Sequence, residues 1–174
     1  NRKADLMEKS EYFDLITSML KDTGIKSMII RKYIPIINVT INNYLKQLGF
    51  FVKFVMDENF EEKIYARGID EQNYYNFSEG EKLRIDLAVL LAWRDIARMQ
   101  NNLNTNLLVF DEILDGSIDT GGADAFIDLI QAMQDINIFV VSHSPDRWSD
   151  KFRGNLVFGK EGGFSKLLTA WPIY

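Results

Sequence analysis

The segment YYNFSEGEKLR, Tyr74 to Arg84, leads directly into an apolar stretch with helical periodicity, residues 85–97. Ser78 and Glu81 have the S-x-x-E spacing of a capping box, in which each side chain accepts a hydrogen bond from the other residue's backbone amide. A capping box does not explain Gly80, because glycine costs about 1 kcal/mol relative to alanine inside a helix. A first turn with free amides and a serine hydroxyl is also typical of an anion site. From this segment alone, both a helix cap and a phosphate site remain open.

Two later segments have the pattern of buried strands that end in chemically useful side chains. Residues 106–112 (NLLVFDE) are apolar up to two final carboxylates, and residues 137–144 (NIFVVSHS) contain the one histidine of the chain. Between them lie a turn-rich loop, residues 115–122, and a helix-periodic segment, residues 123–135. The order strand, helix, strand predicts a parallel crossover unit and an α/β fold.

The composition of the chain excludes several classes of protein. A chain of 174 residues, 47% of them hydrophobic, can bury a sizeable core and is not disordered. The absence of cysteine excludes disulfides and thiolate metal sites, and a single histidine excludes the usual zinc clusters. No apolar run approaches the ~18 residues of a membrane helix, so we expect no membrane contact. The net charge of −5 means that any DNA contact must come from a local basic patch or from parts outside this chain.

The N-terminal residues 1–24 predict the root of a coiled coil, followed by a single lobe from residue 25 to residue 174. Apolar residues there follow a/d-like steps: Leu6, Phe13, Ile16 and Leu20. An ordinary amphipathic helix would give the same pattern over so few heptads. Because the chain begins inside this helical pattern and without methionine, we expect it to be a piece of a longer protein.

The remaining segments predict a second helix and two hairpins. Apolar residues at helical spacing predict a helix over residues 25–48, which Pro35 should kink or divide. Residues 50–56 and 63–67 predict one antiparallel hairpin, and residues 155–170 predict a closing one.

One segment approaches the phosphate-binding loop pattern GxxxxGK[ST], and we reject it. In GNLVFGKE, residues 154–161, a carboxylate replaces the hydroxyl that should meet magnesium. The spacer has the pattern of a strand, and Gly162 and Gly163 follow where a helix would have to begin. The chain therefore lacks a recognisable loop of its own for cradling phosphates.

Taken together, these motifs resemble the C-terminal lobe of an ABC-type ATPase head, in the SbcC-like and SMC-like branch of DNA double-strand-break repair. FSEGEK resembles the signature motif, residues 106–112 resemble the Walker B strand, and residues 137–144 resemble the strand of the switch histidine. The resemblance is specific between residues 74 and 144 and extends to the flanks only in layout. It implies the C-terminal half of a head that closes as a dimer over two ATP molecules and drives a nuclease in DNA end processing and recombination.

The resemblance also implies roles for the strand-end residues. Glu112 would polarise the attacking water as general base, and Asp111 would hold Mg²⁺, directly or through water. For this pair, the alternative is a solvated acidic turn. His143 would contact the γ-phosphate, although a strand-end histidine considered alone is more often a bystander.

Two further groups would face the nucleotide across the seam between two heads. The signature residues are Ser78, Gly80 and Lys82. The residues in the place of the D-loop are Asp115, Ser117 and Asp119, for which an Asx or serine turn is the alternative. Glu79 departs from the family pattern, which has glycine there. A carboxylate beside a triphosphate is repelled by about 1 kcal/mol even with water-like screening, so we expect Glu79 to point away from the nucleotide.

The implied cofactors are ATP and Mg²⁺. The implied partners are an N-terminal lobe carrying the phosphate-binding loop, a second copy of the head, an SbcD-like nuclease and DNA, with no membrane. The implied location is the cytoplasm, that of the host if the protein is phage-encoded, and the chain alone is expected to be inactive.

Two other classes of function remain open. One is a stand-alone divalent-metal nuclease using the acidic residues and histidine of the strand ends: Asp111, Glu112, Asp115, Asp119 and His143. It leaves Ser78 and Gly80 unexplained. The other is an SMC-type structural DNA tether, which as a non-enzymatic module would not need Glu112.

Overall fold

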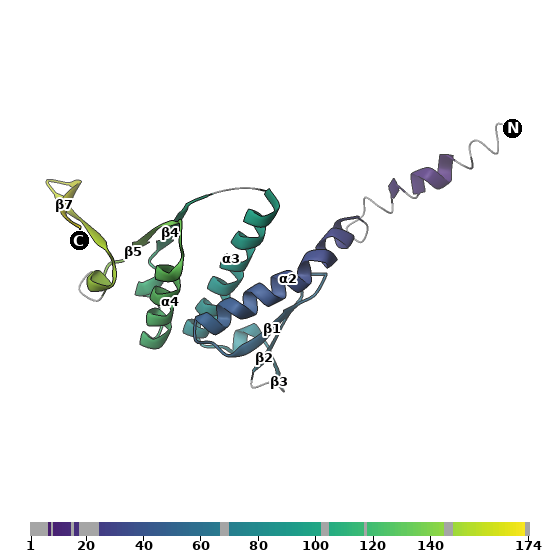
Figure 1. The fold of residues 1–174 in the computed structure, drawn as a ribbon, viewed down its shortest axis with the longest axis horizontal. Helices are drawn as coiled ribbons and strands as arrows, with labels where there is room; N and C mark the ends of the chain where they lie inside the picture. The colour runs from purple at the N-terminus through teal and green to yellow at the C-terminus, as the bar shows by residue number, and fades with distance from the viewer. Residues whose placement is uncertain are drawn as a thin grey trace. The chain divides into compact units, whose positions relative to one another are not determined.

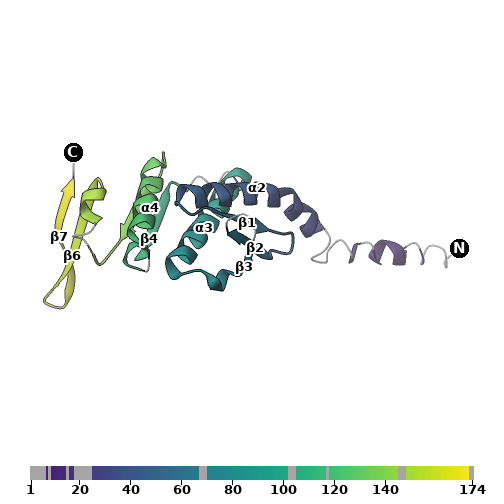
Figure 2. The same cartoon turned by 90° about the horizontal axis from the view of Figure 1, so that it is seen from below.

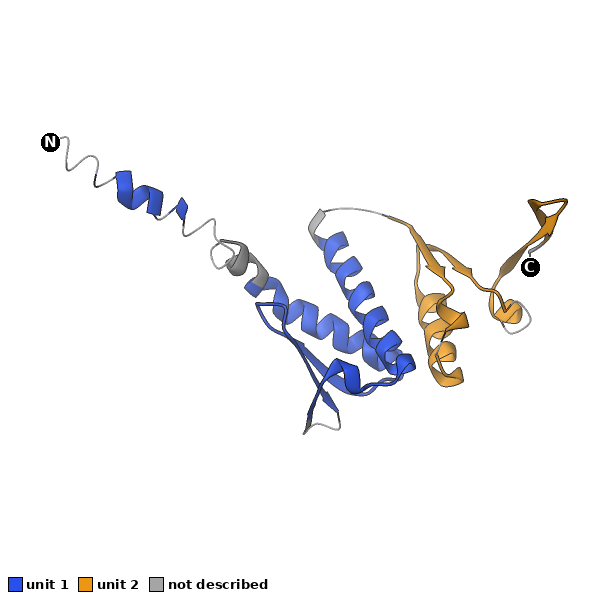
Figure 3. Cartoon of the chain, turned by 180° about the vertical axis from the view of Figure 1, so that it is seen from behind, with its two compact units in different colours: residues 1–104 blue, residues 105–174 orange. Residues whose placement is uncertain are grey.

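The computed structural model describes residues 7, 9–14, 16–17, 25–66, 70–101, 105–116, 118–144 and 148–172 (Figures 1 and 2). The chain divides into two compact units, residues 1–104 and residues 105–174, coloured blue and orange in Figure 3. The predicted coiled-coil root and its boundary at residue 24 lie largely outside the described residues and stay predictions. In the described part, no helix is long and apolar enough to cross a membrane.

From residue 25 on, the described part of unit 1 consists of two long helices and a three-stranded antiparallel sheet. The elements are α2 (Ile25–Gln47), β1 (Val52–Met56), β2 (Glu62–Ala66), β3 (Asp70–Gln72), the 3₁₀ turn η1 (Tyr74–Asn76) and α3 (Glu79–Asn101). The strand order is β1-β2-β3, and Phe54 of β1 lies opposite Ile64 of β2. The predicted hairpin is confirmed. The short, polar β3 was missed, because Asp-Glu-Gln has no strand-like pattern.

Helix α2 continues through Pro35 as one element, so the predicted start of a fresh segment there does not occur. Proline removes one intrahelical hydrogen bond, but tertiary packing can outweigh this cost. The packing is supplied by Ile37, Ile41 and Leu45, which repeat every four residues after the proline and are buried. They face the same core as the buried residues of the sheet and of α3, which lies beside α2 (Figure 1).

Two asparagines of α2 bind the free edge of β1. Asn42 donates from Nδ2 to Phe54 O (2.7 Å) and accepts from Phe54 N (2.9 Å). Asn38, one helical turn earlier, makes the same pair of bonds to Met56, at 2.9 and 2.8 Å. The distance between the two asparagines along α2 matches the distance between Phe54 and Met56 along β1. Four helical residues rise about 6 Å, and two strand residues rise about 6.8 Å. The two amides thus replace a neighbouring strand and attach the sheet to the helix.

Unit 2 begins with the predicted parallel crossover, which is confirmed. Strand β4 (Leu107–Asp111) pairs in parallel with β5 (Asn137–Val141), from Leu107 opposite Asn137 to Asp111 opposite Val141, and α4 (Thr120–Ala132) connects them. Phe110 of β4 packs edge-to-face on Phe126 of α4, with ring centroids 5.0 Å apart. The expected α/β fold class, with parallel strands, flanking helices and antiparallel hairpins, is therefore confirmed.

The C-terminal hairpin of unit 2 consists of β6 (Gly154–Glu161) and β7 (Phe164–Pro172) (Figure 2). Gly162 and Gly163 connect the strands with φ angles of +61° and +86°, which glycine adopts without strain. The segment that approached a phosphate-binding loop is therefore a β-strand followed by a turn, in agreement with its rejection.

One face of the parallel pair is exposed within the described part of unit 2. Leu107, Val109, Phe139 and Val141 share this face, and Val109 is 58% exposed and Phe139 52% exposed. The opposite face packs on α4. Parallel sheets are almost always covered on both faces. This pair of strands has apolar residues on both faces, which is typical of strands in such a covered sheet.

We expect Asn42→Ala to lower the free energy of unfolding of the chain by about 2 kcal/mol, because it leaves both backbone polar groups of the buried Phe54 without partners. Urea denaturation measures the change. The matched control is Asn43→Ala, which removes an exposed neighbour and should change stability by less than about 0.5 kcal/mol. Equal effects of the two substitutions would contradict the edge-binding role of Asn42.

Candidate functional site

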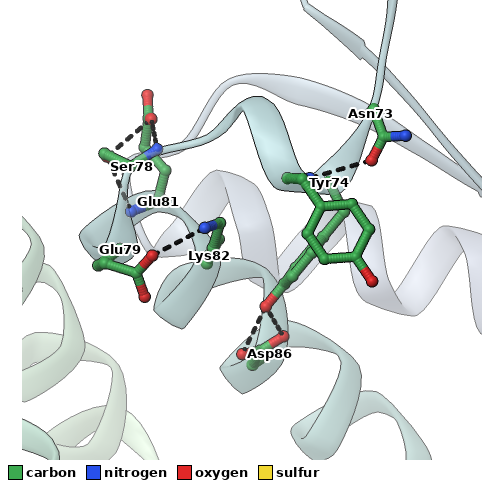
Figure 4. Close-up of polar contacts among 8 residues, drawn as sticks. Asn73, Tyr74, Ser78, Glu79, Glu81, Lys82 and Asp86 are labelled. Atoms are coloured by element: carbon green, nitrogen blue, oxygen red, sulfur yellow. Dashed lines mark hydrogen bonds and ion pairs between the residues drawn. The ribbon is translucent and has the colours of Figure 1, made fainter.

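The signature segment forms a complete capping box at the start of α3 (Figure 4). Glu81 Oε2 accepts from Ser78 N (2.9 Å) and from Ser78 Oγ (2.8 Å), and Glu81 N donates to Ser78 Oγ at 3.4 Å. Lys82 N donates to Ser78 O at 2.9 Å. The serine hydroxyl is exposed but uses its hydrogen within the chain. In this conformation the helix carries its own carboxylate at the place where an external anion would be received.

The other signature residues have local partners or are buried. Lys82 Nζ lies 2.7 Å from Glu79 Oε1, so the carboxylate that departs from the family pattern is paired with a cation of the same turn. Gly80 is buried within the chain. Burial gives a second reason for glycine at this position, in addition to the predicted approach of a nucleotide. The predicted roles of both residues toward an opposing head stay predictions.

A tyrosine before the signature was missed by the sequence analysis. Tyr74 OH donates to the carboxylate of Asp86, about two turns into α3, at 2.9 Å from each oxygen (Figure 4). Burial, followed by this hydrogen bond, raises the pKa of Tyr74 to about 12. Asn73 Oδ1 accepts from Tyr75 N and fixes the preceding turn. The Y-Y-N segment therefore holds the entry to α3 in one conformation, a tertiary contact that spacing alone does not predict.

The strand-end residues of unit 2 do come together. His143 Nε2 lies 2.7 Å from Glu112 Oε1, and the carboxylate oxygen is the acceptor. Glu112 N also donates to Val141 O at 2.9 Å, which extends the parallel ladder beyond β4. Glu112 has φ 56° and ψ 14°, in the left-handed region that non-glycine residues rarely adopt. Such strain is concentrated at functional sites, so the conformation supports a functional role for Glu112.

Asp115 binds the end of β5 rather than its own backbone. It ends the 3₁₀ turn η2 (Ile113–Asp115), and its carboxylate accepts from Ser142 Oγ (2.6 Å) and from His143 N. Burial acts to raise the pKa of Asp115, but hydrogen bonds, chiefly those from the Ser142 hydroxyl and the His143 backbone, outweigh it, and the pKa is lowered. Asp115 is therefore held as a carboxylate with two donors.

The remaining two residues predicted for this edge belong to the loop before α4. Asp119 is at the N-cap position of α4, where its carbonyl accepts from Ala123 N at 2.9 Å. Ser117 lies outside the described residues. The predicted D-loop contacts of Asp115, Ser117 and Asp119 with a nucleotide stay predictions.

Asp111 is the residue that fits a magnesium ion. It is exposed at the end of β4, and among the described residues its side chain makes no hydrogen bond or ion pair. Magnesium is usually held by one or two carboxylates together with substrate phosphates and water. The described residues contain no group of three or more ligand side chains that could hold a metal by themselves. Asp111 could therefore bind a metal together with a phosphate and water.

Sequence comparison finds a phage relative. The chain is 40% identical over 166 residues to exonuclease subunit 2 of Enterobacteria phage T4, which covers 95% of this chain and 30% of that protein. The motifs also predict a likeness to the large subunit of the T-even phage recombination endonuclease, and this relative confirms it. The chain spans less than a third of the relative's length. No protein-family profile matches the chain.

Structure comparison finds SMC ATPase heads. One is a chain from work on ATP-driven dimerization and DNA-stimulated activation of SMC ATPases, with a TM-score of 0.67 and 18% identity, covering 84% of this chain and 90% of that one. Another is the Smc head domain of Pyrococcus furiosus with an extended coiled coil, bound to the C-terminal domain of ScpA, with a TM-score of 0.68 and 18% identity, covering 99% and 43%. The resemblance to SbcC-like and SMC-like ATPase heads is therefore confirmed.

We expect Ser78→Ala to destabilise the chain by about 1 kcal/mol, because the capping hydroxyl of α3 is lost. Thermal unfolding followed by circular dichroism measures the effect. Ser78→Thr keeps a hydroxyl at the cap and should stay within about 0.5 kcal/mol of the wild type. If Ser78→Ala were as stable as the wild type, the capping box would not contribute to folding.

Proposed function

We propose that this chain, a homologue of phage exonuclease subunit 2 with the fold of an SMC-like ATPase head, is the C-terminal half of an ATP-hydrolysing head. In this proposal a separate lobe supplies the phosphate-binding loop, and two heads close over ATP, by analogy with the ATP-driven dimerization of the SMC ATPases. The head then drives an SbcD-like nuclease partner on DNA ends.

The observation that carries the proposal is the contact between Glu112 and His143 at the ends of two parallel strands. Ligands of open α/β sheets bind beyond the carboxyl ends of the strands, which is where this pair lies. Glu112 is exposed and strained, and it can accept a proton from an attacking water. His143 can donate from Nε2, either to Glu112, as here, or to a phosphate oxygen.

Magnesium would be held by Asp111 and would supply charge neutralisation on the phosphates. Asp111 is the last residue of β4, and Glu112 follows it in the left-handed conformation. Of the two, only Glu112 is engaged with His143, so Asp111 would bind the metal while Glu112 keeps that contact.

The exposed face of β4 and β5 supports the existence of a second lobe. The exposed apolar side chains on this face would cost free energy in water, at roughly 25 cal/mol for each Å² of apolar surface. A lobe that packs a further layer against this face would cover them. The chain itself has no recognisable phosphate-binding loop, so the same lobe would provide both the cover and the loop.

Ser78 is proposed to meet a phosphate presented by a second head. Its hydroxyl is bound by Glu81 in this structure, so the phosphate must displace that carboxylate. Phosphate oxygens and carboxylate oxygens are both charged acceptors, so one can replace the other at the same donors. The pairing of Glu79 with Lys82 reduces the repulsion that a further carboxylate would cause.

The two alternative classes receive less support. A stand-alone metal nuclease needs a ligand group that holds its ion, and the described residues contain none. A purely structural DNA tether does not require the strained conformation of Glu112 or its contact with His143.

We expect Glu112→Gln, in a protein that joins this chain to the phosphate-binding lobe, to lower ATP turnover by about a hundred- to ten-thousandfold, since a positioned general base contributes that much. ATP binding should be retained, because glutamine has nearly the same size. Phosphate release and filter binding measure the two quantities. Asp128→Asn, an exposed change on α4, is the matched control and should leave turnover unchanged. Normal turnover of Glu112→Gln would remove Glu112 from the mechanism.

The proposal as a whole is tested by supplying the missing lobe. We expect the 174-residue chain alone to bind ATP weakly or not at all and to release no phosphate. Addition of a lobe with a phosphate-binding loop, covalently or as a separate chain, should produce Mg²⁺-dependent hydrolysis that rises with protein concentration as heads pair. Calorimetry and a phosphate-release assay measure both. Micromolar ATP affinity or steady turnover by the chain alone would contradict the half-site proposal.

A further inference from the structure

The position of His143 is set by polar contacts rather than by packing. Its side chain is 77% exposed, so no surrounding core holds the ring at one place. Among the described residues, the partners of its ring and of its backbone N–H come from one short segment after β4. Glu112 reaches the ring at Nε2, and Asp115 accepts the backbone N–H of His143. The ring and the backbone of this residue are thus held by two carboxylates that are three positions apart in the chain.

Asp115 also organises the residues on either side of His143. One of its oxygens accepts from Ser142 Oγ at 2.6 Å, and the other accepts from His143 N. Ser142 Oγ in turn accepts from Ser144 N at 3.0 Å. The carboxylate therefore fixes three consecutive residues beyond the end of β5, directly or through the Ser142 hydroxyl.

The turn η2 explains how Asp115 reaches β5. Glu112 adopts the left-handed conformation, and Asp115 N donates to Glu112 O at 3.1 Å to close the turn. The chain is thereby redirected, and the carboxylate of Asp115 reaches the neighbouring strand end. Without the turn, residue 115 would continue away from β4, at about 3.3 Å per residue for extended chain.

We infer that Asp115 is a positioning residue, which orients the segment Ser142 to Ser144 so that the His143 ring meets Glu112. Each carboxylate oxygen accepts one hydrogen bond from this segment, so Asp115 acts on the ring through the backbone of His143. The catalytic importance of the arrangement rests on the proposed function. The positioning itself is a property of this chain and can be measured without ATP.

The chemistry of the contact requires a carboxylate of this length. Its two donors are a hydroxyl and a backbone amide, and an ionised aspartate offers acceptors to both. Asparagine has one acceptor oxygen, and its NH₂ group would face the other donor. The lowered pKa of Asp115 agrees with a carboxylate that stays ionised between these donors.

Nuclear magnetic resonance on the 174-residue chain tests the inference, because His143 is its one histidine and gives a single set of ring signals. In the wild type we expect a slowly exchanging His143 amide and nuclear Overhauser effects between the ring and the Glu112 side chain. In Asp115→Ala we expect the His143 amide to exchange about tenfold faster or more, because a hydrogen bond to a charged group is lost. We also expect the nuclear Overhauser effects between the His143 ring and the Glu112 side chain to disappear.

A purely structural role of Asp115 would give a different result. In that case exchange would rise to the same extent at the core amides of α4, such as Phe126 and Ile127, and this outcome overturns the inference. An unchanged His143 amide, or unchanged contacts between the ring and Glu112, also overturns it. Asp128→Ala is the matched control and should leave every one of these signals as in the wild type.

The conservative variant Asp115→Asn covers the case in which Asp115→Ala does not fold. It keeps the size of the side chain and one acceptor, so the His143 amide should still exchange several-fold faster while the α4 amides stay protected. Protection of His143 at the wild-type level in Asp115→Asn would overturn the inference. Failure of the proposed function would instead appear as absence of ATP hydrolysis in the presence of the second lobe, and these spectra would not change.

Discussion

The parallel, in-register pairing of β4 with β5 is the constraint on which the candidate site depends. Asp111 lies opposite Val141, so the residues after each strand emerge at the same edge. Glu112 and His143 are 31 residues apart in sequence and 2.7 Å apart in space. A slip of one residue would reverse the faces of one strand, which would move Phe110 out of its contact with Phe126. The packing on α4 therefore fixes the register, and the register fixes the site.

In both units, polar side chains make hydrogen bonds at a strand edge or strand end that a neighbouring strand's backbone would otherwise make. In unit 1, Asn38 and Asn42 take the edge of β1 as a further strand would. In unit 2, Asp115 accepts hydrogen bonds from the amide of His143 and the hydroxyl of Ser142, beyond the last paired residue of β5. A buried or constrained backbone group needs a partner, and short polar side chains supply one where strands end. Unit 2 also leaves an apolar surface without a partner, because its described part does not cover the exposed face of β4 and β5.

Ser78 and His143, the proposed donors to phosphate, are bound by the chain's own carboxylates. Glu81 accepts from Ser78, and Glu112 contacts His143. A phosphate that approached either donor would have to compete with a carboxylate that is already in place. Because a charged acceptor is exchanged for another charged acceptor, the net free energy of the exchange is smaller than that of either bond. Under the proposed function, this competition keeps the resting site closed to weakly bound anions.

The sequence by itself determined the elements and the order of the motifs. Its periodicity predicted the parallel crossover and both hairpins, and the S-x-x-E spacing predicted the capping box that Ser78 and Glu81 form. These features depend on local pattern, which a sequence carries directly. The resemblance to SbcC-like and SMC-like heads also followed from short motifs, and the phage relative confirms it.

Only the tertiary structure decided which side chains meet. It placed His143 on Glu112, joined the Asp115 carboxylate to the residues after β5, and kept α2 continuous through Pro35. It also revealed the bonds of Asn42 to β1 and of Tyr74 to Asp86. Each of these depends on strand register, on a left-handed turn or on packing between elements distant in sequence. Spacing along the chain does not encode them, because contacts between distant segments are formed only when the whole unit folds.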